Sequence, residues 1–308
     1  MGEFSKYVGE VGEEIVNDFL KLFGWKNLCS NKQLDCCVGE HAKKTHGIDA
    51  LYVYNSMLQK QSLVSVVVSA KYSSVPYDKV KTTFRSHFKE LAHTIECYSK
   101  SQFKRTITRQ FPGSSRKEDI GVLFYLNNDE SDSNDNIKGE IINHRIDSTL
   151  KFNAIHLVDN ARAKFLYNSI SFIKKKHGEI SFFCLNTTLN VSSSTRHSKI
   201  MPVEYITSPI IPISVPDDNG RKFILLCDFN YSKESLGLVY KLARKLCSDF
   251  ANHYEIYFNK YNKLTDSPSV DEVKMAQNFE DGSEDVVGDI TLIVDSYNST
   301  FRSISDEK

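Results

Sequence analysis

The sequence predicts an α/β protein whose N-terminal core follows the order helix, strand, strand, strand, helix, strand. Two observations support this prediction. Apolar residues recur at helical spacing in two segments of the N-terminal third, and runs of β-branched residues bounded by polar turns lie between and after these segments. Strand and helix patterns continue to alternate through the rest of the 308-residue chain, which predicts an α/β C-terminal extension or second domain.

The first predicted helix ends at Gly24, because a glycine there can adopt the left-handed conformation that closes a helix. Its apolar stripe consists of Ile15, Val16, Phe19, Leu20, Leu22 and Phe23. A mixed stretch over residues 27–38 is consistent with one strand, and the polar segment 39–47 is typical of a turn. These elements open the core.

The two strongest strand patterns cover residues 48–54 and 63–72, and a second helix is predicted from about Asp78 to Tyr98. The apolar stripe of this helix consists of Val80, Phe84, Phe88, Leu91, Ile95 and Tyr98. A basic segment then leads into a strand predicted over residues 120–126, which completes the core.

An acidic segment rich in Ser and Asn, residues 128–138, predicts a boundary between a core of residues 1–130 and a C-terminal region of residues 139–308. In that region we expect strands at 153–158, 180–186, 222–229 and 290–297, and helices at 159–177 and from Ser232 to about Tyr261. Prolines make 203–215 resemble an edge strand, and the acidic stretch 265–288 resembles a loose linker. Partner binding and sheet extension both remain open as roles for this region.

The composition narrows the class of protein. The chain has 39 basic and 39 acidic residues, so a nucleic-acid partner would have to be bound by a local basic surface. Its seven cysteines form no disulfide framework, which favours a reducing compartment. The N-terminus lacks the apolar stretch of a signal peptide, and no apolar run reaches the length of a membrane span. We therefore expect a soluble cytoplasmic protein with no membrane partner.

Chemically informative residues lie on the two strongest predicted strands. Asp49 opens the first, and Lys71 ends the second, where strand alternation puts Ser69 on the same face as Lys71. The opposite face is apolar: Val64, Val66, Val68 and Ala70. Hydrolysis of a phosphodiester needs carboxylates that hold a divalent metal ion, and a lysine beside them can orient water or offset transition-state charge.

This arrangement resembles the PD-(D/E)xK, or restriction-endonuclease-like, nuclease superfamily over residues 8–127. The resemblance rests on the element order, on Gly47-Ile48-Asp49, on Lys71 in the following strand, and on Gly12-Glu13 in a first helix followed by Gly24. It implies a mixed sheet flanked by helices. It also implies that Asp49 bridges the metal, that Lys71 is the catalytic lysine, and that Glu13 is an accessory metal ligand. Val16 and Leu20 follow Glu13 at helical spacing, so Glu13 borders the inward face, whereas Glu14 should face solvent.

The activity implied by the resemblance is that of a metal-dependent endonuclease using Mg²⁺ or Mn²⁺, acting on DNA in a bacterial restriction or antiphage defence system. One position departs from the family pattern, because Ser69 replaces the acidic residue or Gln found two residues before the lysine. Glu90 or Glu96 of the following helix could supply the missing carboxylate. The alternative is a catalytically silent subunit that binds nucleic acid or scaffolds a partner ATPase.

Partners are less constrained by the sequence. The chain has no G-x₄-G-K-[ST] motif, so an ATP-driven step would require a separate ATPase or helicase chain. Part of the apolar stripe after Ser232 is compatible with a homo-oligomer interface. Taken alone, each proposed catalytic residue has a structural explanation: Asp49 as a turn residue, Glu13 as a helix N-terminal acid, and Lys71 as a lysine extending from a sheet edge. Their joint order favours the catalytic interpretation.

A second group of residues invites a metal-site interpretation. It consists of Cys29, Cys36, Cys37, His41 and His46. Zinc sites usually contain a C-x₂-C pair, which is absent here, and adjacent cysteines on a strand would point to opposite faces. The sequence therefore favours buried free thiols over zinc.

Basic residues beside the proposed site indicate where nucleic acid would bind. The residues predicted to contact phosphates are Lys79, Arg85, Lys104, Arg105 and Arg109. The alternative is that this segment is simply a solvated face.

Overall fold

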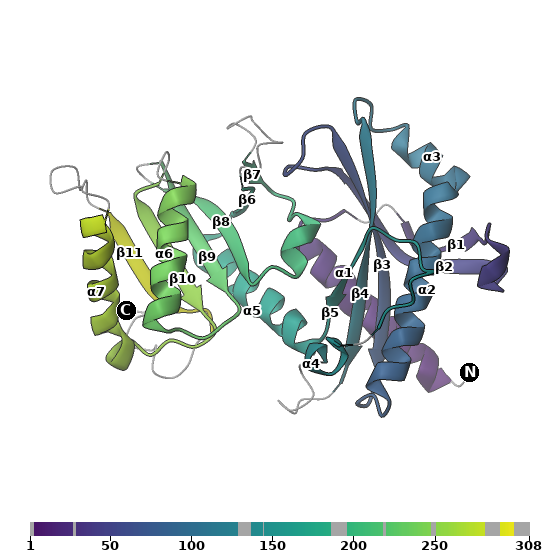
Figure 1. Ribbon diagram of the computed structural model, residues 1–308, viewed down its shortest axis with the longest axis horizontal. Helices are drawn as coiled ribbons and strands as arrows, with labels where there is room; N and C mark the ends of the chain where they lie inside the picture. The colour runs from purple at the N-terminus through teal and green to yellow at the C-terminus, as the bar shows by residue number, and fades with distance from the viewer. Residues whose placement is uncertain are drawn as a thin grey trace. The chain divides into compact units, whose positions relative to one another are not determined.

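A computed structural model describes residues 3–26, 29–128, 137–143, 145–185, 196–217, 220–247, 251–280 and 290–298. The chain forms two compact units (Figure 1). The N-terminal unit comprises Met1–Lys164 and Pro202–Thr207, and the C-terminal unit comprises Phe165–Met201 and Ser208–Lys308. In the described residues, no helix is both long and apolar enough to cross a membrane.

The N-terminal unit contains a mixed five-stranded sheet in the order β1-β2-β3-β4-β5. Its strands are β1 (Cys29–Asp35), β2 (Thr45–Asn55), β3 (Ser62–Ser73), β4 (Arg116–Asn127) and β5 (Ala154–Val158). Strand β2 is antiparallel to both β1 and β3, whereas β4 runs parallel to both β3 and β5. The predicted core order and mixed sheet are confirmed.

Helix α1 (Glu3–Leu22) covers one face of this sheet and buries Val16, Phe19 and Leu20. It begins at Glu3, before its apolar stripe, and most of its first two turns, including Phe4 and Tyr7, are exposed. Gly24 closes it as predicted, with φ of 74° and with two backbone hydrogen bonds, from Gly24 to Lys21 and from Trp25 to Leu20.

Helix α2 (Val80–Lys100) covers the opposite face. Its Phe84, Phe88, Leu91 and Ile95 share a core with Val67 and Leu123, whereas Phe19 of α1 contacts Phe124. Adjacent residues of a strand point to opposite faces, so the sheet lies between the two helices. The central strand β3 is therefore apolar on both sides.

Several shorter helical elements complete this unit. The helices are α3 (Gln102–Thr108) and α4 (Lys138–Ile141), and the 3-10 turns are η1 (Gly39–His41) and η3 (Val203–Ile206). Because β5 pairs with β4, the compact unit extends past the predicted boundary at residue 130 to Lys164. Most of the acidic segment proposed as the boundary, residues 129–136, lies outside the described residues.

The C-terminal unit contains a second sheet in the order β11-β10-β9-β8-β6-β7. Its strands are β6 (Ser181–Phe183), β7 (His197–Ser198), β8 (Ile210–Asp217), β9 (Gly220–Cys227), β10 (His253–Phe258) and β11 (Thr291–Ser296). Its helices are α5 (Asn160–His177), within which the two units divide, α6 (Lys233–Cys247) and α7 (Lys263–Glu280). The α/β character predicted for the C-terminal region is confirmed.

Three predictions in this unit were wrong. The helix predicted to reach Tyr261 ends at Cys247, because β10 is buried on both faces and a continuous apolar run does not distinguish a strand from a helix. The predicted linker contains α7, whose narrow buried stripe is formed by Val273 and Gln277. Strand β8 contains Pro212 and Pro216 but is not the predicted edge strand, because it lies between β9 and β6. The sheet accommodates these prolines because β6 pairs only with Ile213 and Ser214 of β8.

Candidate active site

Asp49 is held where β2 and β3 separate. The last paired residues of these strands toward this end are Ala50 and Val68. Beyond them, the Asp49 carboxylate Oδ2 accepts the backbone N–H of Ala70 at 2.7 Å, and the Ser69 hydroxyl donates to the same carboxylate. These contacts fix Asp49 at the end of the β2–β3 ladder, next to the residues that precede Lys71.

The environment of Asp49 disfavours its negative charge. Burial raises the pKa of Asp49 above its ordinary value, and the neighbouring Glu13 carboxylate raises it further. The Ala70 N–H, the Lys71 charge and the Ser69 hydroxyl lower it without cancelling the increase. Two carboxylates that repel one another at a partly buried position are the arrangement that a bound cation stabilises.

Glu13 reaches this position because α1 packs closely on β3. A Cβ on Gly12 would lie 2.5 Å from the Cβ of Tyr72, so only glycine allows this approach. The neighbouring Glu13 is partly buried, whereas Glu14 is exposed, as predicted. The sequence Gly12-Glu13 thus combines the helix contact with delivery of the carboxylate.

Asn31 of β1 is a site residue that the sequence analysis missed. The register pairs Ser30 with Ala50 and Lys32 with Ile48, so Asn31 lies across from Asp49. Its φ is 51°, a left-handed conformation that Asn adopts more readily than most residues. Its side-chain amide donates to Glu13 Oε2 at 3.0 Å, which orients the Glu13 carboxylate.

Lys71 lies at the end of β3 with its side chain 25% exposed and its ammonium 3.3 Å from Glu90 Oε2. The other Glu90 oxygen accepts from Lys43 at 3.0 Å, and His87 Nδ1 lies 4.0 Å from Glu90 Oε2. Burial would raise the pKa of Glu90, but the charges and hydrogen bonds of Lys71 and Lys43 outweigh it and the pKa lies below its ordinary value. The Glu90 carboxylate is therefore favoured in its ionised form, and it holds the Lys71 ammonium in place.

Two carboxylates were considered as substitutes for the acidic residue that Ser69 replaces. Glu90 is brought to Lys71, and its role as a possible metal ligand stays a prediction. Glu96 is directed elsewhere, because its oxygens pair with His41 at 3.2 Å and with Lys100 at 2.7 Å. Glu96 is therefore excluded from this site.

The donors present suit a hard divalent cation. Among the described residues, the carboxylates do not form a preassembled group of three, since the one cluster of three or more close metal-ligating atoms contains Cys and His. Mg²⁺ is usually bound through one or two carboxylates and retains several waters. Glu13 and Asp49 meet that requirement, and their mutual repulsion favours a cation between them.

The protein-family comparison agrees with this geometry. The family model described as "GAPS4 protein PD-(D/E)XK nuclease domain" matches residues 1–162, more than half of the 308-residue chain. The chain belongs to this family. No curated protein and no solved structure matches it. The predicted resemblance to PD-(D/E)xK nucleases in the N-terminal part is confirmed, and the matched segment includes β5.

The basic residues predicted to bind phosphates do not form one compact patch on the PD-(D/E)XK nuclease domain. Lys79 lies at the N-terminal end of α2, whereas Arg105 and Arg109 lie on α3 beyond its C-terminal end, and all three are exposed. The 21 residues of α2 separate the two groups by about 30 Å. The prediction that Lys104 binds phosphate is wrong. Its side chain is only 13% exposed, and its ammonium pairs with buried Asp119.

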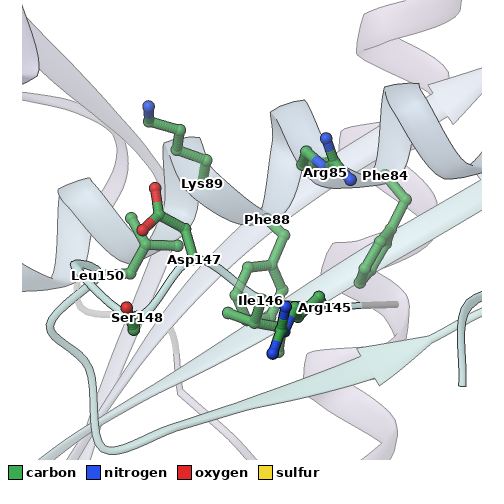
Figure 2. A pocket seen from close by; sticks show the side chains of 9 residues that line it. All are labelled: Phe84, Arg85, Phe88, Lys89, Arg145, Ile146, Asp147, Ser148 and Leu150. Atoms are coloured by element: carbon green, nitrogen blue, oxygen red, sulfur yellow. The ribbon is translucent and has the colours of Figure 1, made fainter. Parts of the chain in front are cut away.

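Arg85 lines a pocket of the nuclease domain beside α2, shown in Figure 2. The pocket has a volume of 590 Å³ and is formed by Phe84, Arg85, Phe88, Lys89, Arg145, Ile146, Asp147, Ser148 and Leu150. Three cationic side chains and one carboxylate line it over an apolar floor. Arg85 thus remains a candidate for phosphate contact, supported by Lys89 and Arg145.

Proposed function

We propose that the chain is a metal-dependent endonuclease that hydrolyses phosphodiester bonds of DNA in a bacterial restriction or antiphage defence system. The observation that carries the proposal is the convergence of Glu13, Asp49 and Lys71 from α1, β2 and β3 within a nuclease domain of the PD-(D/E)XK type. None of the seven cysteines is joined in a disulfide, which favours a reducing compartment such as the cytoplasm.

Glu13 and Asp49 would hold Mg²⁺ or Mn²⁺. When bound, the ion would supply positive charge for the scissile phosphate and acidify a coordinated water. The protein fixes this site before metal arrives, because Asp49 is anchored by Ala70 and Glu13 by Asn31. Preorganised donors of this kind avoid the cost of reorientation during the reaction.

Lys71 supplies the remaining charge. Its charge acts on the Asp49 carboxylate, and its ammonium would stabilise the charge that develops on the phosphate oxygens or orient the attacking water. Glu90 pairs with this ammonium and orients it, and Lys43 donates to the other Glu90 oxygen. We therefore assign Glu90 and Lys43 as positioning residues.

The substrate path is proposed from exposed cations. Lys79 is the N-cap of α2 and Arg85 lies in the half of α2 that precedes Glu90, whereas Arg105 lies on α3 and Arg109 is the C-cap of α3. A nucleic-acid backbone running along α2 would contact both groups and pass Glu90 between them. Lys104 is not included, because it is paired with Asp119.

The alternative function is a catalytically silent subunit that binds nucleic acid or scaffolds a partner ATPase. Ser69 favours it, because a hydroxyl is a weaker ligand for Mg²⁺ than a carboxylate and this one already donates to Asp49. The C-terminal unit would then serve assembly with a partner chain or with a second copy.

The deciding experiment incubates the full chain with supercoiled plasmid, linear DNA and RNA in Mg²⁺, Mn²⁺ or EDTA. Parallel reactions contain proteins encoded by neighbouring genes. We expect metal-dependent DNA cleavage that EDTA stops and that Asp49→Ala lacks. Nucleic-acid binding without cleavage under every condition would instead support the silent subunit.

A further inference from the structure

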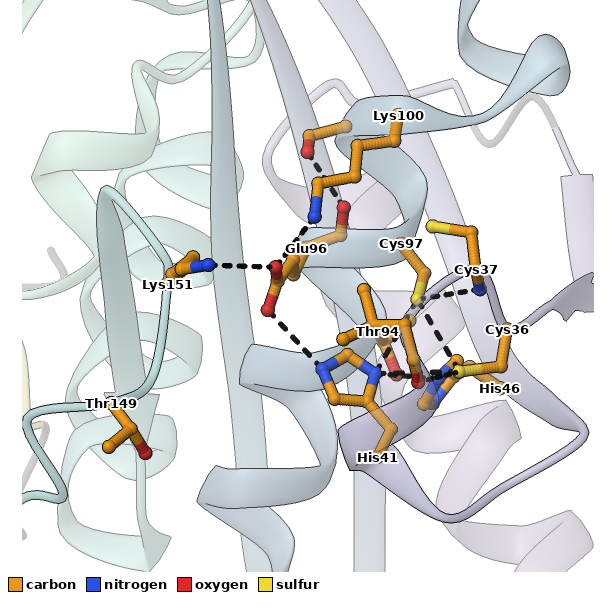
Figure 3. Close-up of polar contacts among 12 residues, drawn as sticks. Cys36, Cys37, His41, His46, Thr94, Glu96, Cys97, Lys100, Thr149 and Lys151 are labelled. Carbon is orange, nitrogen blue, oxygen red and sulfur yellow. Dashed lines mark hydrogen bonds and ion pairs between the residues drawn. The ribbon is translucent and has the colours of Figure 1, made fainter.

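A second cluster of metal-ligating side chains lies in the N-terminal unit, away from the carboxylates (Figure 3). Cys36 and His41 come from the loop between β1 and β2, His46 from the first residues of β2, and Cys97 from α2. One donor atom from each lies within 4.8 Å of the others. His41, His46 and Cys97 are buried, and Cys36 is partly buried.

Four of the six distances between donor atoms match the edges of a metal-centred tetrahedron, and the two between His46 and the sulfurs are within 4.8 Å. The two sulfurs are 3.8 Å apart, each lies 3.5 Å from His41 Nδ1, and His41 Nδ1 lies 3.3 Å from His46 Nε2. Tetrahedral zinc, with bonds of about 2.3 Å to sulfur and about 2.0–2.1 Å to nitrogen, requires edges of about 3.8, 3.6 and 3.3 Å for these three kinds of pair.

Hydrogen bonds among the four groups do not explain this arrangement. His41 Nδ1 lies within 3.5 Å of three other donor atoms at once. A ring nitrogen either carries one proton or presents one lone pair, so it can satisfy one of these contacts well and leaves the others poorly paired. A single cation at the centre satisfies all four atoms together.

We propose that Cys36, His41, His46 and Cys97 bind a structural zinc ion. Thiolate and imidazole are the ligands that zinc prefers, and they discriminate against Mg²⁺. Four protein ligands leave no open coordination position, so this zinc holds the fold together and takes no part in hydrolysis. The site is independent of the proposed nuclease activity.

The surroundings support metal ligation. His41 Nε2 lies 3.2 Å from Glu96 Oε2, which places the ring proton on Nε2 and turns the Nδ1 lone pair toward the cluster. A carboxylate that orients a ligating histidine in this way is the usual outer partner at zinc sites. The backbone N–H of Cys37 donates to Cys97 Sγ at 3.4 Å, and His93 stacks on His41 at 3.8 Å. Figure 3 also shows Lys100 and Lys151 directed at Glu96.

Zinc would tie the β1–β2 loop to α2. This loop carries Lys43, which contacts Glu90 of α2 beside the catalytic lysine. A Cys36–Cys97 disulfide would produce a similar link, but the sulfurs are 3.8 Å apart, well beyond the bonded distance of about 2.05 Å. The spacing of the ligands explains why the sequence did not reveal the site, because Cys97 lies 61 residues after Cys36.

The test is metal analysis of the full chain purified under reducing conditions without added zinc. We expect one zinc per chain, and cobalt substitution should produce the thiolate-to-cobalt charge-transfer absorption of a tetrahedral site. Cys36→Ser and Cys97→Ser should lose most of the zinc and the thiolate absorption. Cys37→Ser is the matched control, because Cys37 is exposed and its sulfur is not one of the four clustered donor atoms.

The wild-type chain keeps the test decisive if the variants do not fold. A zinc-selective chelator should remove the metal and lower the melting temperature, and added zinc should restore it. The proposal is overturned by a folded wild-type chain that contains no zinc and gives no cobalt–thiolate absorption, or by a Cys36–Cys97 disulfide in its intact mass. It is overturned equally if folded Cys36→Ser and Cys97→Ser variants retain full zinc.

Discussion

The candidate active site and the Cys36–His41–His46–Cys97 cluster share β2 and α2 but differ in every property that controls metal binding. The candidate active site offers two partly buried carboxylates and a lysine that is 25% exposed, and its hard oxygen ligands suit Mg²⁺. The second cluster offers two sulfurs and two nitrogens, mostly buried and closed to further ligands.

The difference shows how one helix can serve catalysis and stability together. Glu90 lies near the middle of α2 and faces Lys71, and Cys97 lies about two turns later and faces the β1–β2 loop. A rigid connection at Cys97 would limit the motion of Glu90 relative to the sheet. A metal at the active site would remain open to exchange with solvent, whereas a zinc ion at the second cluster would add a connection between α2 and the β1–β2 loop.

The largest expected effect is the loss of cleavage on substitution of residues of the candidate active site, with no change at the second cluster. Asp49→Ala and Lys71→Ala should each reduce plasmid cleavage by about 10²–10³-fold or more, because each removes charge stabilisation of the transition state. The melting temperature and zinc content should stay near those of the wild type. Cleavage rates under saturating Mg²⁺ provide the measurement.

Adjacent glutamates offer the matched control for this prediction. Glu13→Gln should slow cleavage, since Glu13 contacts Asn31 and lies beside Asp49, whereas Glu14→Gln should leave it unchanged because Glu14 is exposed. Wild-type cleavage by Asp49→Ala or Lys71→Ala would show that the reaction occurs elsewhere in the molecule.

The next largest effect is expected from removing Mg²⁺ or zinc separately, since each removal should change a different property of the protein. Omitting Mg²⁺ should abolish cleavage and lower the melting temperature only slightly, because the ion would offset only the repulsion between Glu13 and Asp49. Removing zinc should lower the melting temperature by roughly 10 °C, the shift expected when a domain of this size loses about 3 kcal/mol. Differential scanning calorimetry with each metal removed separately measures both effects. Equal thermal shifts for the two ions would contradict the division of roles.

A smaller effect is expected when the Ser69 hydroxyl is removed from the candidate active site. Its hydroxyl lowers the pKa of Asp49, so Ser69→Ala should raise that pKa. Metal binding needs the ionised carboxylate, and the acid side of the pH–rate profile should therefore move to higher pH while the rate at alkaline pH changes little. An unchanged profile would mean that Asp49 ionisation does not limit the reaction.

A carboxylate at the same position tests whether the site lacks a ligand. If Ser69 leaves a coordination position unfilled, Ser69→Asp should tighten Mn²⁺ binding by about 10-fold, about 1.4 kcal/mol, and preserve or raise cleavage. If Glu90 already serves there, the added charge should crowd the site and reduce cleavage, and Glu90→Ala should be nearly as damaging as Asp49→Ala. Tighter Mn²⁺ binding without cleavage would identify a silent subunit.

The sequence predicted those features of the active site that follow from local pattern. Strand alternation and the Gly47-Ile48-Asp49 motif were enough to place Asp49 and Lys71 on adjacent strands, and helical spacing was enough to distinguish Glu13 from Glu14. Asn31 could not be found in this way, because its role depends on the register between β1 and β2 and on a left-handed φ.

The second cluster was missed for a related reason. The group of possible metal ligands predicted from the sequence contained Cys29, Cys36, Cys37, His41 and His46 but not Cys97, which lies on α2. Cys36 and Cys37 were also expected on a strand, whereas β1 ends at Asp35 and the loop turns Cys36 inward and leaves Cys37 exposed. The expectation of a buried thiol was therefore wrong for Cys37. Contacts between residues distant in sequence determine a site of this kind.

The smallest expected effect concerns the solvent-facing cations that would guide nucleic acid to the open site. The double variant Arg105→Ala with Arg109→Ala should weaken DNA binding. It should also make the slope of log affinity against log salt concentration shallower by about 2, because about one counterion fewer is released for each phosphate contact that is lost. Lys104→Ala is the matched control on the same helix. Its ammonium is paired with Asp119, so its loss should leave the salt slope unchanged and lower the melting temperature by exposing an unpaired buried carboxylate. A reduced slope for Lys104→Ala would mean that the Asp119 pair opens when DNA binds, and an unchanged slope for the double variant would place the DNA along Lys79 and Arg85 instead.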